Sequence, residues 1–217
     1  MKRLKRLGAW TALLVIALAL SACGTVYVNP YAEIPKPVAT VTVDVDGSVY
    51  TLRFTLDPGA APNTVSNFIN LANAGFYDGL KIDYVYPTYF LRGGDPKGDG
   101  TGGPDYTIAG EFKDNGFEFN NLKHTRGVIS MCRQENDYNS AGSQFFVMLS
   151  SHSEYNDQYA AFGYIESADT ESFNALNELE QRTTDNEYRP ILRQTITNIR
   201  VDTKGYVYTV IKYGEEQ

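Results

Sequence analysis

The feature of the sequence that most restricts its fold is a series of short apolar stretches separated by turn residues. Residues 41–45 alternate apolar and polar side chains, reach Asp46-Gly47, and continue as a second alternating stretch at 49–56. Asp-Gly between two alternating stretches is typical of a hairpin with a two-residue type I′ turn. Further stretches that predict strands are 80–85, 89–92, 127–131, 144–149, 161–165, 195–201 and 206–213.

Two segments have the periodicity of amphipathic helices. Residues 62–74 begin with Pro62, which suits a first helical turn, and are followed by Gly75, a favoured residue just after a helix. Residues 169–179 predict a second helix. Many short strands and two helices predict a mainly β fold: a closed antiparallel eight-stranded barrel with the two helices covering its ends.

The first 22 residues have the composition of an export signal. A basic start precedes an apolar run at 9–20, which is too short to span about 30 Å of hydrocarbon as a helix. Leu20-Ser21-Ala22-Cys23 resembles the bacterial lipoprotein signal, in which the cysteine thiol receives a diacylglycerol and becomes the new N-terminus. This resemblance implies lipidation of Cys23 and an extracytoplasmic protein anchored to the cell membrane. The alternative is a secreted protein cut at Ser21-Ala22, with an incidental cysteine.

We therefore expect a signal peptide at 1–22, a proline-containing tether at 23–37 and one domain at 38–217. The chain has a net charge of −7, and its first 22 residues carry four basic side chains and no acid, so the remainder carries −11. Such an acidic body repels nucleic acid and anionic lipid through its surface field, and we expect a monomer without a nucleic-acid partner. One cysteine beside the signal and one in the body imply no disulfide framework.

Four stretches of the body, in order, resemble the signatures of the cyclophilins, the peptidyl-prolyl isomerases. They are Gly93–Gly103, rich in glycine, Gly-Val-Ile-Ser-Met at 127–131, Ser-Ala-Gly-Ser-Gln-Phe-Phe at 140–146 and Tyr-Ala-Ala-Phe-Gly at 159–163. The resemblance covers roughly 41–201. It implies the cyclophilin barrel and acceleration of X-Pro isomerisation in exported proteins as they fold.

Rotation about an X-Pro bond faces a barrier of about 18–20 kcal/mol, because the amide has double-bond character. A protein lowers it by holding the proline ring in a dry pocket and donating a hydrogen bond to the prolyl nitrogen as conjugation is lost, without metal or cofactor. Cyclophilins use an arginine for this donor, and their matching glutamine, here Gln144, bonds the substrate backbone. The resemblance places the substrate-binding residues at Tyr89, Phe90, Phe146, Tyr155, Tyr159 and Phe162.

The sequence departs from the family at the catalytic arginine. Tyr84 stands at that position, Asp83 stands at the preceding histidine, and Arg92 replaces the supporting glutamine on the next strand. Because Tyr84 and Arg92 flank the turn between two antiparallel strands, we expect their side chains to share one groove. Our hypothesis is that Arg92 supplies the guanidinium and that Tyr84 donates a hydroxyl or orients it. The alternative is a solvated Arg92 and a catalytically weak proline-peptide-binding chaperone or adaptor.

Other chemistry finds little support in the sequence. His124 and His152 lack the spacing of zinc ligands, so we expect no metal. The glycine-rich loop lacks the Gly-Lys-Ser/Thr of a phosphate loop. Cys132 ends an apolar strand, which favours a small buried hydrophobe over a nucleophile.

Overall fold

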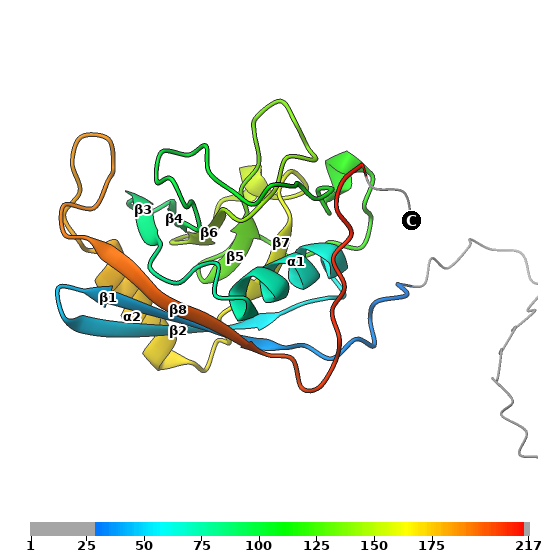
Figure 1. Cartoon of the computed structure of the whole chain (residues 1–217), viewed down its shortest axis with the longest axis horizontal. Helices are drawn as coiled ribbons and strands as arrows, with labels where there is room; N and C mark the ends of the chain where they lie inside the picture. Colours follow the sequence, from blue (N-terminus) through cyan, green and yellow to red (C-terminus); the bar gives the residue numbers. More distant parts are fainter. Residues whose placement is uncertain (1–28, 215–217) are drawn as a thin grey trace, which may run out of the picture.

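The computed structural model describes residues 29–214, so the predicted signal and Cys23 lie outside the described part. Figure 1 shows a barrel with two helices packed against it. The strands are β1 (Val38–Val45), β2 (Ser48–Leu56), β3 (Lys81–Tyr86), β4 (Phe90–Gly93), β5 (Val128–Met131), β6 (Phe145–Met148), β7 (Ala161–Tyr164) and β8 (Gln194–Asp202). They close in the order β1-β2-β7-β5-β6-β4-β3-β8, and every neighbouring pair is antiparallel. The predicted eight-stranded barrel is confirmed.

The hairpin predicted at Asp46-Gly47 is present. The φ angles are +52° at Asp46 and +83° at Gly47, and Val45 pairs with Ser48 directly across the turn. Positive φ at both central residues is the property of a type I′ turn, whose twist matches that of the flanking strands. The register of β1 and β2 therefore follows from these two residues.

Helix α1 (Pro62–Asn73) covers one end of the barrel and is capped by a distant carboxylate. Glu111 accepts hydrogen bonds from the backbone nitrogens of Asn63 and Thr64 at 2.9 and 2.7 Å. These nitrogens have no partner within the helix, and an anion is favoured at this end of the helix dipole. Burial raises the pKa of Glu111, while the same hydrogen bonds oppose that shift.

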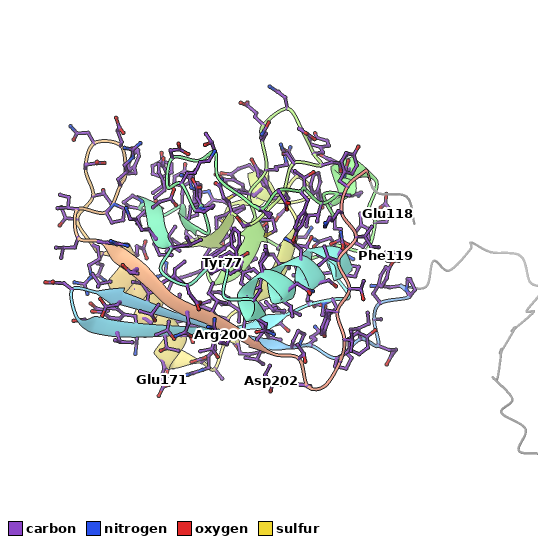
Figure 2. The ribbon with its side chains drawn as sticks, in the orientation of Figure 1. Tyr77, Glu118, Phe119, Glu171, Arg200 and Asp202 are labelled. Carbon is purple, nitrogen blue, oxygen red and sulfur yellow. The ribbon has the colours of Figure 1, made fainter. Side chains whose placement is uncertain are left out.

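The barrel interior is filled by aromatic and branched side chains. Phe68 from α1 packs against Tyr77, Phe145 and Phe162, with ring centroids 5.1 to 5.8 Å apart. Tyr77 lies near the centre of the molecule, whereas Arg200 lies on its outer surface (Figure 2). One apolar cluster thus joins the inner faces of the strands to α1.

Helix α2 (Thr170–Glu180) packs against β2, and its buried Ala175, Leu176 and Leu179 join the apolar cluster of the barrel interior, so α2 caps the barrel as predicted. Asp169 caps the helix by accepting from the backbone nitrogen of Ser172 at 3.0 Å. Arg53 on β2 donates two hydrogen bonds to the Asp169 carboxylate, which joins the helix start to the barrel. The short 3₁₀ helices η1 (Lys113–Asn115) and η2 (Ser153–Tyr155) lie in connecting segments. No helix within residues 29–214 is long and apolar enough to cross a membrane.

The strand predicted at 206–213 is wrong. Residues 203–214, which we call the strap, run extended across α1 without pairing with any strand (Figure 1). Their alternation is real: Tyr208 is buried, whereas Val207 and Thr209 are exposed. Side chains of α1 hold most of the strap, since Asn70 donates to the Tyr208 carbonyl oxygen at 3.0 Å, and one backbone hydrogen bond, from Tyr213 to Thr107, fastens its end. The alternation at 206–213 therefore indicates that one face of the segment is buried, and helix α1 covers that face.

Candidate active site

Three adjacent strands bring the predicted catalytic residues into one row. Tyr84 on β3 pairs with Arg92 on β4, and Arg92 pairs with Phe146 on β6. Residues directly opposite one another in antiparallel strands project to the same face. The intervening Leu91 and Val147 belong to the barrel interior, so the row of Tyr84, Arg92 and Phe146 lies on the outer face.

Arg92 is held by an ion pair with Asp83. Its Nη2 lies 2.5 Å from Asp83 Oδ2 and its Nε lies 3.4 Å from Oδ1. An irregularity in the β3–β4 register between Ile82 and Tyr84 puts Asp83 and Tyr84 both beside Arg92. Burial acts to lower the Arg92 pKa, but the hydrogen bond and charge of Asp83 raise it overall. The guanidinium is therefore charged and fixed in orientation.

The remaining guanidinium nitrogen faces a groove. Within residues 29–214, Nη1 of Arg92 makes no hydrogen bond, and Arg92 lines a cavity of about 500 Å³ together with Gln144 and residues 100–104. The Gln144 amide nitrogen donates to the carbonyl oxygens of Gly100 and Gly102 at 3.0 and 2.8 Å. These bonds fix the amide and leave its oxygen to accept from a peptide N–H.

Cys132 also lines this groove, but its thiol does not act as a nucleophile at neutral pH. Burial raises the pKa of its thiol to about 12, so the thiol stays protonated at neutral pH. A protonated thiol is a poor nucleophile. The expectation of a small buried hydrophobe at this position agrees with the structure.

An aromatic cluster around Phe146 adjoins the groove, and we call it the aromatic pocket because the resemblance implies that a proline ring binds there. The Phe146 ring is 3% exposed, and its centroid lies 5.4 Å from that of Phe90, 5.8 Å from Tyr155 and 5.5 Å from Tyr159. Beneath it, the His124 ring stacks at 5.9 Å. These rings form a cluster separate from the barrel interior. The surroundings of Phe146 are aromatic and largely buried, which suits contact with a pyrrolidine ring.

Two of the predicted substrate-binding residues lie outside the cluster around Phe146, one at its edge and one in the barrel interior. Tyr89 stacks between Tyr86 and His152, at centroid distances of 4.4 and 4.0 Å, and contributes to the rim of the pocket. Phe162 is fully buried in the barrel interior against Phe68, so the prediction that it lies at the pocket edge is wrong. The strand period explains this, because Phe162 projects from β7 to the inner face.

The structure adds residues that the sequence did not indicate. Tyr188, from the loop between α2 and β8, lies 4.6 Å from the Tyr86 ring and 5.7 Å from the Tyr84 ring. Its carbonyl oxygen accepts from the backbone nitrogen of Val85, which docks the loop on β3. The sequence shows that Asp83 is an acid near Arg92. It does not show the irregular β3–β4 register that brings the two side chains together. Tyr188 had no local signal.

Buried His124 makes stability depend on pH. Burial lowers its pKa from 6.5 to about 4, and its ring nitrogens face Ser130 and Asn156. The His124 imidazole is therefore protonated below about pH 6.5 in the unfolded chain, but only below about pH 4 in the folded chain. The free energy of unfolding is therefore highest above pH 6.5. It falls by up to about 3 kcal/mol as the pH falls from 6.5 to 4. Urea unfolding of the wild type and His124→Gln between pH 4 and 7 measures the difference.

His152 is the matched control, because its contribution to stability changes with pH in the opposite direction. The pKa of His152 is raised, chiefly because its ring donates to the Thr88 carbonyl oxygen, so its contribution is lost as pH rises instead. His152→Gln is expected to weaken the protein more at low pH than at high pH. A wild-type-minus-variant difference for His124→Gln that stays constant with pH would contradict the assignment.

The geometry defines a class of protein before any comparison: a site with a fixed guanidinium, a glutamine amide and an apolar pocket, but no nucleophile. Within residues 29–214 no three His, Cys, Asp or Glu side chains are placed to hold a metal ion. Such a site binds and polarises without forming a covalent bond. Facilitated rotation about an amide bond is chemistry of this kind.

Comparison with known proteins identifies the family. The model of the "Cyclophilin type peptidyl-prolyl cis-trans isomerase/CLD" family matches residues 40–201. Peptidyl-prolyl cis-trans isomerase B of Bacillus subtilis is 43% identical over 116 residues, which cover 54% of this chain and 76% of that protein. An isomerase of Helicobacter pylori is 40% identical over 121 residues, covering 56% and 69% respectively.

A solved structure agrees with these relatives. The cyclophilin-type isomerase of Cryptosporidium parvum, crystallised in the presence of the dipeptide Ala-Pro, superposes with a TM-score of 0.66 at 27% identity. The match covers 76% of this chain and 98% of that one. The chain belongs to the cyclophilin family and is a peptidyl-prolyl cis-trans isomerase.

Proposed function

We propose that this isomerase accelerates X-Pro rotation in exported proteins from a lipid anchor at Cys23, with Arg92 as its hydrogen-bond donor. One observation carries the catalytic part. Arg92 keeps a free Nη1 in a groove that has Gln144 on one side and the aromatic pocket of Phe146 on the other. A proline ring on Phe146 would place its nitrogen beside β4.

Each group has a separate task in this proposal. The apolar pocket holds the ring and excludes water, and the Gln144 oxygen accepts from the peptide backbone. Arg92 Nη1 donates to the prolyl nitrogen once the twisted amide releases its lone pair. Asp83 keeps the guanidinium charged and aimed, and the Tyr84 ring supports it at 5.4 Å. The donor gains strength only in the twisted state, which lowers the barrier.

The substrate class follows from the pocket and from the relatives. The parasite enzyme was crystallised with Ala-Pro, which supports a proline-containing peptide as the ligand here. In a protease-coupled assay on a short Ala-Pro peptide, we expect the cis-to-trans rate to rise in proportion to protein concentration. Peptide binding without any rate increase would favour the binding chaperone or adaptor, to which the loss of arginine at Tyr84 points.

The closed barrel supports a monomer. Every strand in residues 29–214 has two neighbours, so no sheet edge is open for pairing with another chain. Sedimentation equilibrium of the leaderless chain is expected to return the mass of one copy. A dimer mass at low micromolar concentration would contradict this part of the proposal.

The anchor rests on Leu20-Ser21-Ala22-Cys23. Two acyl chains, at about 0.8 kcal/mol per buried CH₂, hold a protein stably on a bilayer. Cys23→Ala is expected to release the protein into the soluble fraction or to leave it unprocessed. Fractionation and mass spectrometry of the N-terminal peptide measure this. Unchanged membrane partition at unchanged mature size would refute the anchor.

A further inference from the structure

The strap presents an apolar face to solvent. Residues 29–214 have nine exposed large hydrophobic side chains, and four of them lie on the strap. These four are Tyr206 (42% exposed), Val207 (82%), Ile211 (47%) and Tyr213 (57%). The others lie in separate places, on the β1–β2 hairpin, near Tyr138 and on the loop at 188–192. Clustering of this kind in a soluble domain marks a contact surface.

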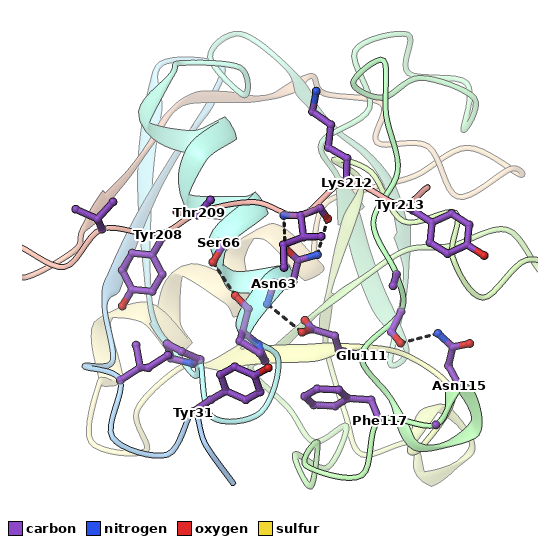
Figure 3. A pocket seen from close by; sticks show the side chains of 18 of the residues that line it. Tyr31, Asn63, Ser66, Glu111, Asn115, Phe117, Tyr208, Thr209, Lys212 and Tyr213 are labelled. Atoms are coloured by element: carbon purple, nitrogen blue, oxygen red, sulfur yellow. Dashed lines mark hydrogen bonds between the residues drawn. The ribbon is translucent and has the colours of Figure 1, made fainter. Parts of the chain in front are cut away.

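The strap is fastened at several points, so its backbone is held in place against α1. Asn63 on α1 accepts from the Ile211 nitrogen at 2.8 Å and donates to the Ile211 oxygen at 2.9 Å (Figure 3). The Tyr208 hydroxyl donates to the Pro35 carbonyl oxygen at 2.7 Å. Tyr213 donates its backbone N–H to Thr107. The apolar face is therefore a built feature rather than a loose chain end.

The described chain begins beside this strap. Tyr31 and Ile34 line the same cavity of about 650 Å³ as Tyr208 and Tyr213 (Figure 3). Asn29 is fixed by its side-chain amide, which donates to the Gly59 carbonyl oxygen at 2.8 Å. Residues 29–37, within the predicted tether, thus contact the barrel.

This contact shortens the link to the anchor. Asn29 lies six residues beyond Cys23, and six residues span at most about 20 Å even when fully extended. An acyl group on Cys23 would therefore keep Asn29, and the strap beside it, within reach of the bilayer surface.

The charge of the strap fits such a surface. Residues 203–214 contain Lys204 and Lys212 and no acid, whereas the chain beyond the signal carries −11. Glu215 and Glu216 follow only at the end of the strap. Tyrosine, aliphatic and lysine side chains together are the composition favoured at the membrane–water interface.

We propose that the strap lies on the lipid bilayer, with Val207, Ile211 and the exposed tyrosines in the interfacial layer. This rests on the proposed anchor, and it orients the domain. The β1–β2 turn and the loop at 181–193 lie at the opposite end of the long axis from the strap (Figure 1). That end, which bears Tyr188 beside the row of Tyr84 and Arg92, then faces away from the membrane towards clients.

The sequence permits a clean spectroscopic test. Its one tryptophan is Trp10, so the chain from Cys23 onward contains none. Val207→Trp places a single reporter on the strap, and Val49→Trp places a matched one at a similarly exposed valine, 63% exposed, on the β1–β2 hairpin. The domain is expected to fold without the leader, because the parasite enzyme is matched over 98% of its length by the domain alone.

The anchor is supplied chemically, which separates this test from the proposed function. The Cys23 thiol of the leaderless chain, in a Cys132→Ala background so that only one thiol remains, is coupled to a maleimide lipid in phosphatidylcholine–phosphatidylglycerol vesicles. Emission of the Val207→Trp protein is expected to shift to shorter wavelength on coupling and to be quenched by brominated lipid. Emission of the Val49→Trp protein is expected to stay unchanged.

Two results would overturn the strap proposal: no shift at either position, or an equal shift at both. A second variant, Ile211→Asp in the Val207→Trp background, is expected to reduce the quenching, while its isomerase rate on a soluble peptide stays unchanged. Loss of membrane fractionation in cells tests only the anchor, and loss of isomerase activity tests only the catalytic proposal. Failure of each part is thus recognised separately.

Discussion

Replacing Arg92 with lysine is expected to lower the catalytic rate on an Ala-Pro peptide by about 10²-fold, the scale of losing one preorganised donor. Lysine keeps the positive charge beside Asp83 but has no planar fork, so it cannot bind the carboxylate and direct a second nitrogen into the groove together. Peptide affinity and the unfolding free energy should change little. The protease-coupled assay, peptide titration and urea unfolding measure the three quantities.

Two controls make the Arg92 result specific. Arg53→Lys alters an arginine that also binds a carboxylate through two nitrogens, on β2, and should leave the rate unchanged. Arg92→Gln alone would leave the Asp83 carboxylate, 5% exposed, without its partner, which costs about 3–5 kcal/mol. Arg92→Gln combined with Asp83→Asn avoids that charge. An Arg92→Lys protein as active as the wild type would refute the mechanism.

A compensating pair of changes tests the same idea in the opposite direction. Tyr84→Arg with Arg92→Gln restores the arrangement that the cyclophilin resemblance implies, and the two positions are paired residues of β3 and β4 on the outer face of the barrel. The double variant is expected to be at least as active as the wild type. If the wild type is inactive and the double variant active, the chain works as a proline-peptide-binding module.

Replacing Phe146 with alanine is expected to cost about 3–5 kcal/mol of stability and to weaken proline-peptide binding strongly. The ring contacts Phe90, Tyr155 and Tyr159, so its removal opens a cavity in the pocket floor. Urea unfolding gives the stability, and peptide titration of the folded variant gives the affinity. Unchanged affinity in a folded variant would remove Phe146 from the site.

Phe162→Ala is the matched control for this change. Phe162 is the same residue type and equally buried, but it packs in the barrel interior. We expect a similar loss of stability without a loss of peptide affinity in the folded protein. Equal loss of affinity in both variants would mean that binding follows general stability rather than contact with the pocket.

The sequence by itself determined the eight barrel strands and the two helices. Asp46-Gly47 defines its own turn, because positive φ at two successive residues is a local property. The same holds for α1, which starts at Pro62 and ends before Gly75, whose φ is +78°. Tyr84 and Arg92 were placed together correctly, because a short turn joins their two strands, whereas Phe146 was placed beside them by the resemblance to the cyclophilins.

Tertiary structure decided what depends on partners distant in sequence. The alternation at 206–213 shows that one face is buried, yet only the fold shows that α1 rather than a strand covers it. Likewise, only the fold turns Phe162 into the interior, docks Tyr188 beside Tyr84, and pairs Asp83 with Arg92 through an irregular register. Local residue preferences carry no information about which distant surface covers a side chain, because burial is decided when the whole barrel closes.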